Sequence, residues 1–318
     1  MCDHETMMTD KTKGRLCLLS LFFLVCLQAC TAYTTIKEKT AEAAKSLAFS
    51  GDGMIKKVAV LSPENKTFIS EKDFNELFGQ KFLETLDEEC SDIILIKPKD
   101  KGYPSQLEKL VMQNSGMPDN LTFVKLGREL GLNAIVIVKA VEADAEEKEK
   151  GIPFFKDTHY FGILQINVVA YSMLTGAKII DESPSSETEI DGSEFDAIRA
   201  GETQGIFEIS EALSEMAANA GEKVCETIGE ERWHGYIIAV DGERVRLSSG
   251  RETGLKPGDI LNVYDQGERI QGKNKEVFLI PGEKIGEIKI TEVFAGKGEA
   301  MKVSGGDIQP GCVVRPAE

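Results

Sequence analysis

The hydrophobic pattern of this chain changes its period once, and that change limits the folds it can adopt. Between residues 54 and 228, short apolar runs typical of strands alternate with segments whose apolar residues recur at helical spacing. From Trp233 onward only short strand-like runs occur, separated by turns rich in glycine and proline. The sequence therefore predicts an α/β unit at 54–228, followed by a small all-β unit at 232–318.

The order of the predicted elements defines the α/β unit more closely. Five strands are expected, at residues 57–61, 93–96, 134–138, 160–170 and 178–180. Three helices alternate with them, starting at Ser70, at residue 121 and at residue 206. The strand at 134–138 is apolar on both faces, as a central strand should be. This order predicts an α/β sandwich with a mixed sheet.

The C-terminal unit carries hairpin and turn patterns. Two strand-like runs flank the turn Asp241–Gly242, which predicts a β-hairpin. A turn at 254–258 leads into another strand. A similar turn-and-strand sequence at 308–314 lies at the end of the chain. About six short strands in about 85 residues predict a small barrel of SH3-like size.

The N-terminal segment has the order of a lipoprotein leader. Three basic residues precede an apolar run at 16–27, which is too short to span a membrane and has the length of a signal-peptide core. Ala29 and Cys30 follow, and a Cys at this place can take a thioether-linked diacylglycerol. We expect a signal peptide at 1–29, lipid and palmitate on Cys30, and a polar tether at 30–53. An ordinary secretory signal with a chance Cys is the alternative.

Charge and cysteine content limit the partners and the chemistry. The net charge of −16 argues against nucleic acid and against charge-driven binding to anionic lipids, so membrane contact should come from the lipid. Cys90, Cys225 and Cys312 are far apart and odd in number, which indicates neither a disulfide framework nor a metal site. We expect them to be isolated small apolar residues near a core.

Each sequence pattern that suggests catalysis lacks a residue or a structural context that the chemistry requires. Residues 267–273 match the start of a phosphate-binding loop, but Asn274 follows where Ser or Thr would bind magnesium. His159 and His234 have no second ligand at helical or hairpin spacing, and Ser248–Ser249 lack the context of a nucleophile. We therefore expect no enzyme activity, no cofactor and no metal.

Several short motifs carry a family resemblance. Residues 57–67, 130–136 and 168–178 resemble the curli-secretion lipoproteins of the CsgG type, and together they cover roughly residues 54–228. Residues 254–263 and 284–288 resemble the C-terminal domain of flagellar assembly protein T. The resemblance implies an outer-membrane lipoprotein, facing the periplasm, that helps to assemble or export an extracellular structure. It implies protein partners and is compatible with a homo-oligomer.

The chain departs from the curli channel, in which each subunit donates two hairpins to a shared membrane barrel. The corresponding regions are 142–158, with nine charged residues, and the acidic segment 181–205. Charged side chains on a lipid-facing strand cost about 2–4 kcal/mol each at the midplane. We therefore expect solvated loops in both regions and a non-enzymatic assembly or export component. An oligomeric secretion channel and an enzyme with a dispersed site are the alternatives.

Overall fold

The structure is a computed structural model that describes residues 53–108, 120–202, 204–273 and 276–317. The predicted leader, the predicted lipid site Cys30 and the tether up to residue 52 lie outside the described residues. Within the described ranges, no helix combines the length and the apolar character needed to cross a membrane.

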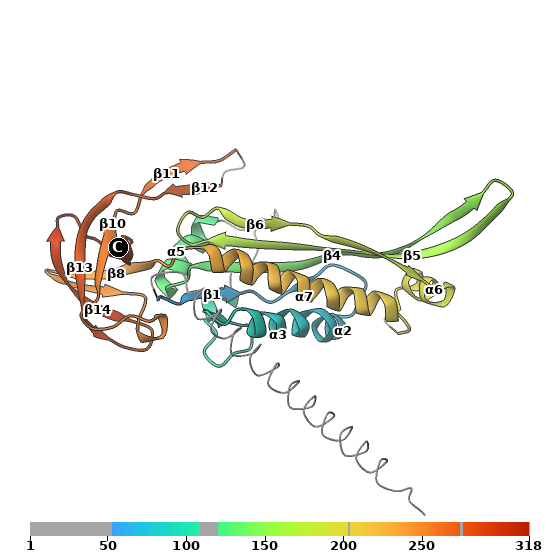
Figure 1. The fold of residues 1–318 in the computed structure, drawn as a ribbon, viewed down its shortest axis with the longest axis horizontal. Helices are drawn as coiled ribbons and strands as arrows, with labels where there is room; N and C mark the ends of the chain where they lie inside the picture. Colours follow the sequence, from blue (N-terminus) through green and yellow to red (C-terminus); the bar gives the residue numbers. More distant parts are fainter. Residues whose placement is uncertain (1–52, 109–119, 203, 274–275, 318) are drawn as a thin grey trace, which may run out of the picture. The chain divides into compact units, whose positions relative to one another are not determined.

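The first part of the described chain forms a mixed sheet, as the sequence predicts. Its strands follow the order β3-β1-β4-β5-β6, with β2 paired to β4 and β7 paired to β5 (Figure 1). Strand β1 is parallel to β3 and β4, whereas β5 is antiparallel to β4, β6 and β7. The strands are β1 (Lys56–Val60), β2 (Glu64–Asn65), β3 (Ile93–Ile96), β4 (Ala134–Ile152), β5 (Phe155–Ser172), β6 (Lys178–Glu182) and β7 (Ser185–Ile190).

The helices begin and end close to the predicted positions. Ser70 caps the first helical segment, since its hydroxyl accepts a hydrogen bond from the Asp73 amide at 3.1 Å. The second predicted helix, α5, ends before Gly131, whose φ of 72° suits glycine. The helices are α2 (Glu71–Phe74), a π-helical turn (Asn75–Gly79), α3 (Gln80–Glu89), α4 (Ser105–Glu108), α5 (Asn120–Leu130), α6 (Gly192–Ala200) and α7 (Phe207–Glu230).

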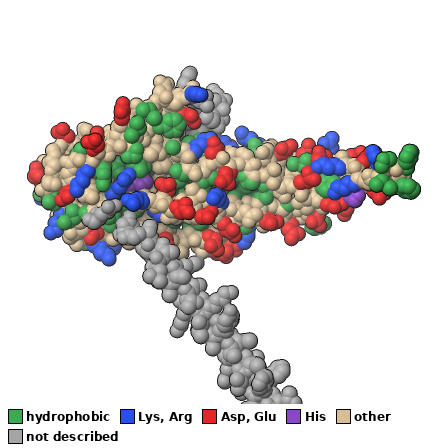
Figure 2. Space-filling view, turned by 45° about the horizontal axis from the view of Figure 1, so that its top comes forward, with side chains coloured by type: hydrophobic (Ala, Val, Ile, Leu, Met, Phe, Trp, Pro, Cys, Tyr) green, Lys and Arg blue, Asp and Glu red, His purple; other side chains and the backbone are tan. Residues whose placement is uncertain are grey.

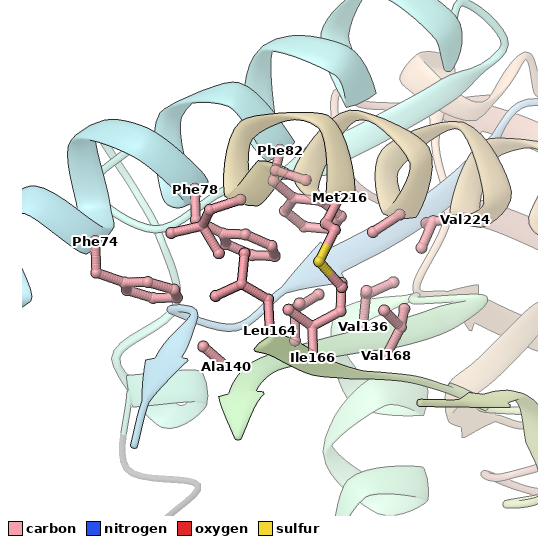
Figure 3. Close-up of a cluster of buried hydrophobic side chains, with 14 of the residues drawn as sticks. Phe74, Phe78, Phe82, Val136, Ala140, Leu164, Ile166, Val168, Met216 and Val224 are labelled. Atoms are coloured by element: carbon pink, nitrogen blue, oxygen red, sulfur yellow. The ribbon is translucent and has the colours of Figure 1, made fainter. Parts of the chain in front are cut away.

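One face of the sheet packs on α3 and α7. The Phe74, Phe78 and Phe82 rings stack in a row, with successive centroids 5.2 and 6.1 Å apart. They belong to the same buried cluster as Leu164 of β5 and Met216 of α7 (Figure 3). The predicted apolar stripes of both helices thus form this core.

The opposite face of β4 is buried as well. Ile135 and Ile137 belong to a second cluster that contains Phe123 of α5 and Tyr171 of β5, whose rings meet edge to face at 5.5 Å. Residues alternate between the two faces of a strand, so β4 needs apolar side chains at every position here. This explains the uninterrupted apolar run that the sequence shows at 134–138.

The C-terminal part contains a closed barrel, which confirms the predicted small all-β unit. Its strands follow the order β10-β13-β14-β9-β8-β15, and a separate hairpin, β11–β12, lies outside the barrel. A core of its own includes Trp233, Leu261 and Ile288, all fully or almost fully buried. The strands are β8 (Gly235–Asp241), β9 (Arg244–Leu247), β10 (Ile260–Tyr264), β11 (Glu268–Gln271), β12 (Val277–Ile280), β13 (Lys284–Val293), β14 (Gly298–Gly305) and β15 (Val313–Pro316).

The barrel and the sheet share buried contacts. Tyr236 and Val313 of the barrel belong to the cluster on the α5 side of the sheet. Asn133 donates a hydrogen bond from its side chain to the His234 carbonyl at 3.0 Å, and Asn120 of α5 donates to the Val277 carbonyl of the separate β11–β12 hairpin at 2.7 Å. Whether the predicted border between 228 and 232 separates two independently folding units stays a prediction.

Candidate functional site

The longest projection of the described chain is a two-stranded hairpin. Strands β4 and β5 continue past the end of β7, whose last pair joins Ile190 to Tyr160. Beyond it, five residue pairs from Lys148–His159 to Ile152–Phe155 have no third strand beside them among the described residues. At about 3.4 Å per residue, this arm, residues 148–159, extends roughly 17 Å beyond the sheet (Figure 1).

The expectation of solvated loops at 142–158 and 181–205 is wrong. The first region forms the outer half of β4 and the first residues of β5, and the second contains the end of β6 and all of β7 and α6. A charged stretch can remain a strand when water reaches both faces of its hairpin. The register also places Lys150 opposite Asp157, a pairing of opposite charges that favours the hairpin.

Ion pairs and cation–π contacts fix the base of the arm. Lys148 lies 2.6 Å from Glu187, and the His159 ring lies 2.6 Å from the Glu189 carboxylate. The hydrogen bond from His159 holds the pKa of the Glu189 carboxyl below its usual value. The ammonium groups of Lys148 and Lys150 also lie 5.0 and 4.2 Å from the centroid of Phe161. These contacts tie the arm to β7 and set its direction.

The tip of the arm is apolar and exposed. Three large side chains are turned to solvent there, with exposed fractions of 68% for Ile152, 99% for Phe154 and 77% for Phe155. Figure 2 shows hydrophobic side chains gathered at the end of the projection, whose sides carry mixed charges. Scattered apolar residues on a surface need no explanation, but a contiguous apolar group does. We define the tip as residues 152–155.

The backbone of the tip is held in an uncommon conformation. Pro153 and Phe154 form the turn, and Phe154 has a φ of 80°, where a type II turn would ordinarily place glycine. A bulky residue in this region costs on the order of 1–3 kcal/mol. Strain of this kind occurs at functional sites, and here it keeps a fully exposed phenyl ring at the end of the arm.

Among the described residues, both edges of the arm are open, and on the β4 side the open edge continues back to residue 141. Beyond Ala140, which lies beside β2, the outer edge of β4 has no strand partner in the described chain as far as Ile152. An open edge presents unpaired backbone amides and carbonyls, to which another strand can add. The charged side chains along this edge oppose unspecific pairing.

A disulfide joins Cys90, at the end of α3, to Cys225 of α7, with a Cα–Cα distance of 5.1 Å. The expectation that these two residues are isolated is therefore wrong. Their pairing depends on the packing of two helices separated by 135 residues in sequence, which spacing rules do not capture. Disulfides persist mainly in oxidising compartments. Cys312 is a buried free thiol, as expected of a core residue.

The other residues considered from sequence do not converge on one site. Burial lowers the pKa of His234 to about 3, so its ring is neutral at physiological pH. Ser248 donates its hydroxyl to the Tyr236 carbonyl at 3.3 Å. Residues 268–271 form β11 of a hairpin, and the partner strand β12 pairs with them. No group of three or more potential metal ligands occurs among the residues that the structure describes.

Comparisons with known proteins place the fold only loosely. No protein-family model matches the chain, and no curated protein matches it in sequence. Among solved structures, a hypothetical protein of Chlamydia trachomatis is similar at 12% identity and a TM-score of 0.32, over 54% of this chain and 99% of its own. A lipoprotein of Neisseria meningitidis has 12% identity and a TM-score of 0.27, over 52% and 99%. A minor lipoprotein of Acinetobacter baumannii has 9% identity and a TM-score of 0.28, over 54% and 94%. At identities and TM-scores this low, the chain is not assigned to the family of any of these proteins.

Proposed function

We propose that this protein is an exported envelope protein, tethered by a lipid on Cys30, that serves as a non-enzymatic assembly or export component. It docks through the tip of its arm into an apolar groove on a second envelope protein. One observation carries the proposal: three large apolar side chains, Ile152, Phe154 and Phe155, are exposed together at the end of a charged hairpin.

Two independent features support a compartment outside the cytoplasm. Residues 11–30 have the basic, apolar and small-residue order of a lipoprotein leader. The disulfide between Cys90 and Cys225 is suited to an oxidising compartment such as the periplasm. The lipid, followed by the tether at 30–53, would hold the folded part at the outer membrane on its periplasmic side.

The charges near the tip favour a protein partner over a lipid surface. Lys150 and Lys156 alternate with acidic Glu149 and Asp157 around the apolar residues, and the whole chain is strongly acidic. An anionic bilayer selects uniformly basic surfaces, whereas a protein groove with a mixed polar rim can match both signs. Burying the three apolar side chains would contribute roughly 5–9 kcal/mol before the costs of association.

The resemblance to known families is part of the proposal. It rests on the short motifs at residues 57–67, 130–136 and 168–178 for the CsgG type and at 254–263 and 284–288 for flagellar assembly protein T. Assembly or export of an extracellular structure is the role that these resemblances suggest.

A second candidate function is an oligomeric secretion channel. The observation that favours it is the open edge of β4 from Val141 to Ile152, within the described residues. Arms of neighbouring copies could pair along this edge by strand addition. In that arrangement the arm would contact other copies of this chain, so the two candidates predict complexes of different composition.

The mass and composition of the complex distinguish these candidates. The lipidated protein would be extracted from membranes in mild detergent, and its complexes weighed and resolved on denaturing gels. We expect a second protein in the wild-type complex and its loss in the variant I152S/F154S/F155S. The matched control F294S/M301S/V303S removes three exposed apolar side chains from the barrel and should keep the partner. A wild-type monomer, or a tip variant that retains the partner, would refute the docking role. A ring built of this chain alone would support the channel.

A further inference from the structure

A pocket of about 250 Å³ lies between α5 and the C-terminal part of the chain, and no residue of the arm lines it. Its walls combine apolar side chains from both parts, Leu121 and Val124 of α5 and Leu279 of β12. Arg128 of α5 and Tyr236 of β8 also line it, and Arg269 of β11 and Lys125 of α5 bring two further cations. The pocket is thus apolar with a concentration of positive charge.

The Arg128 side chain is held in place by backbone carbonyls. Its Nε donates to the Met173 carbonyl at 3.1 Å, Nη2 to Leu174 at 2.8 Å and Nη1 to Gly311 at 3.3 Å. The guanidinium has five N–H donors, so each terminal nitrogen keeps one N–H beyond these three bonds. The group is therefore fixed in orientation while part of its donor capacity remains unused.

No acidic side chain of the described chain forms an ion pair with Arg128. Burial lowers the pKa of its guanidinium; the Tyr236 hydroxyl offsets part of this effect, and repulsion from Arg269 adds to it. Glu129, which also lines the pocket, is exposed. A half-buried cation with cationic neighbours and no carboxylate is costly to maintain, and an anion in the pocket would offset that cost.

The Tyr236 hydroxyl adds a second unused polar group. Tyr236 is fully buried, and its hydroxyl makes no hydrogen bond of ordinary geometry, although the nearby Arg128 guanidinium offsets part of the rise that burial causes in its pKa. The carbon at the centre of the Arg128 guanidinium lies 5.1 Å from the centroid of the Tyr236 ring. Arg315 also influences Tyr236 electrostatically, and its Nε is likewise buried without a partner. Unused buried polar atoms are uncommon in proteins, and the Tyr236 hydroxyl is one that lines the pocket.

We propose that this pocket binds a carboxylate carried on a short apolar stem. The fixed Arg128 guanidinium would hold the carboxylate through its remaining N–H donors, as arginine commonly does. The apolar walls would cover the stem. A volume of about 250 Å³ equals the volume of roughly eight liquid waters, which suits an organic acid with about as many heavy atoms.

The carboxylate could belong to a free organic acid or to the C-terminal residue of a polypeptide. The probes are hexanoate for the first source and a short peptide ending in leucine, with a free or an amidated C-terminus, for the second. Hexanol has the same stem without the charge, and inorganic phosphate has the charge without the stem. Titration calorimetry of the purified protein against each probe is the measurement.

We expect hexanoate or the free-acid peptide to bind with a dissociation constant of about a millimolar or below, and to weaken as salt is added. Hexanol, phosphate and the amidated peptide should bind at least ten-fold more weakly. The variant R128K should bind hexanoate at least ten-fold more weakly, because the lysine ammonium cannot present the paired, coplanar N–H donors of a guanidinium to a carboxylate.

Arg128 holds three carbonyls, so R128K can also affect folding. The exposed Arg269 gives a second variant, R269E, which should weaken hexanoate binding several-fold and leave the unfolding temperature unchanged. R244E makes the same charge change on β9, outside the pocket, and should bind as the wild type does. Equal binding of hexanol and hexanoate, equal binding of phosphate, or no binding of either carboxylate probe would overturn the proposal.

Discussion

Removing the disulfide between Cys90 and Cys225 should destabilise the protein strongly. The cross-link closes a loop of 135 residues between α3 and α7, the two helices that cover the sheet. The loss of loop entropy in the unfolded chain predicts about 5 kcal/mol for a loop of this length. Measured values fall below this limit, so we expect the variant C90A/C225A to lose about 2–5 kcal/mol.

The assay is thermal and urea unfolding with and without a phosphine reductant. At about 2–4 °C per kcal/mol for a protein of this size, the unfolding temperature of the wild type should fall by roughly 5–15 °C on reduction. The double variant should unfold at the lower temperature in both conditions. C312A is the matched control, because Cys312 is buried and unpaired, and its unfolding should still respond to the reductant. If Cys90, Cys225 and Cys312 all react with a thiol reagent in the denatured, unreduced protein, the disulfide and the inference of an oxidising compartment both fail.

Three further predictions concern the anchor, the barrel and the base of the arm. Cys30→Ala should abolish incorporation of labelled palmitate, and normal labelling would show that the lipid lies elsewhere. A fragment of residues 232–318 should give a dispersed amide NMR spectrum, since its closed barrel has its own core, and a collapsed spectrum would contradict the border near residue 232. The lowered pKa of Glu189 means that its bond to His159 stabilises the base of the arm above the usual carboxyl pKa, and that this contribution disappears as pH falls through the folded value. The protection factors of the arm amides, which correct for the slower intrinsic exchange in acid, should therefore fall in acid for the wild type, and an identical acid profile in E189Q would contradict this.

Periodicity predicted the elements whose burial is regular. The helical stripe after Ser70 and the two-sided apolar strand at 134–138 both reflect faces that pack against other elements. The turn at Asp241–Gly242 was likewise predictable, because its flanking strands alternate and glycine supplies the positive φ, 58° at Gly242. In each case the pattern is local and at least one face is buried.

The arm was missed because no buried face marks it. Water reaches both sides of residues 148–159, so hydrophobic alternation is absent and charge density suggested a loop. A signal did exist in the register: folding the chain at Pro153 and Phe154 places Lys150 opposite Asp157 and Ile152 opposite Phe155. Complementary pairs placed symmetrically about a proline-containing turn predict a hairpin even where hydrophobicity does not.

The disulfide and the anion pocket could not be predicted from local patterns. Cys90 and Cys225 meet because α3 and α7 pack side by side, and Arg128 meets Tyr236 because the barrel packs on α5. Such contacts join residues more than 100 positions apart and follow from tertiary packing. The predicted lipid site Cys30 rests on the sequence pattern alone, since it lies outside the described residues.

Site-specific photocross-linking in intact cells tests the central claim most directly. A photoreactive amino acid would replace Phe154 at the tip, and in a matched strain it would replace Phe294, an exposed phenylalanine of the barrel. The account predicts a discrete adduct with a second envelope protein from position 154 and no such adduct from position 294. The absence of any adduct at 154, or the same adducts from both positions, would contradict the claim that the tip is a docking element.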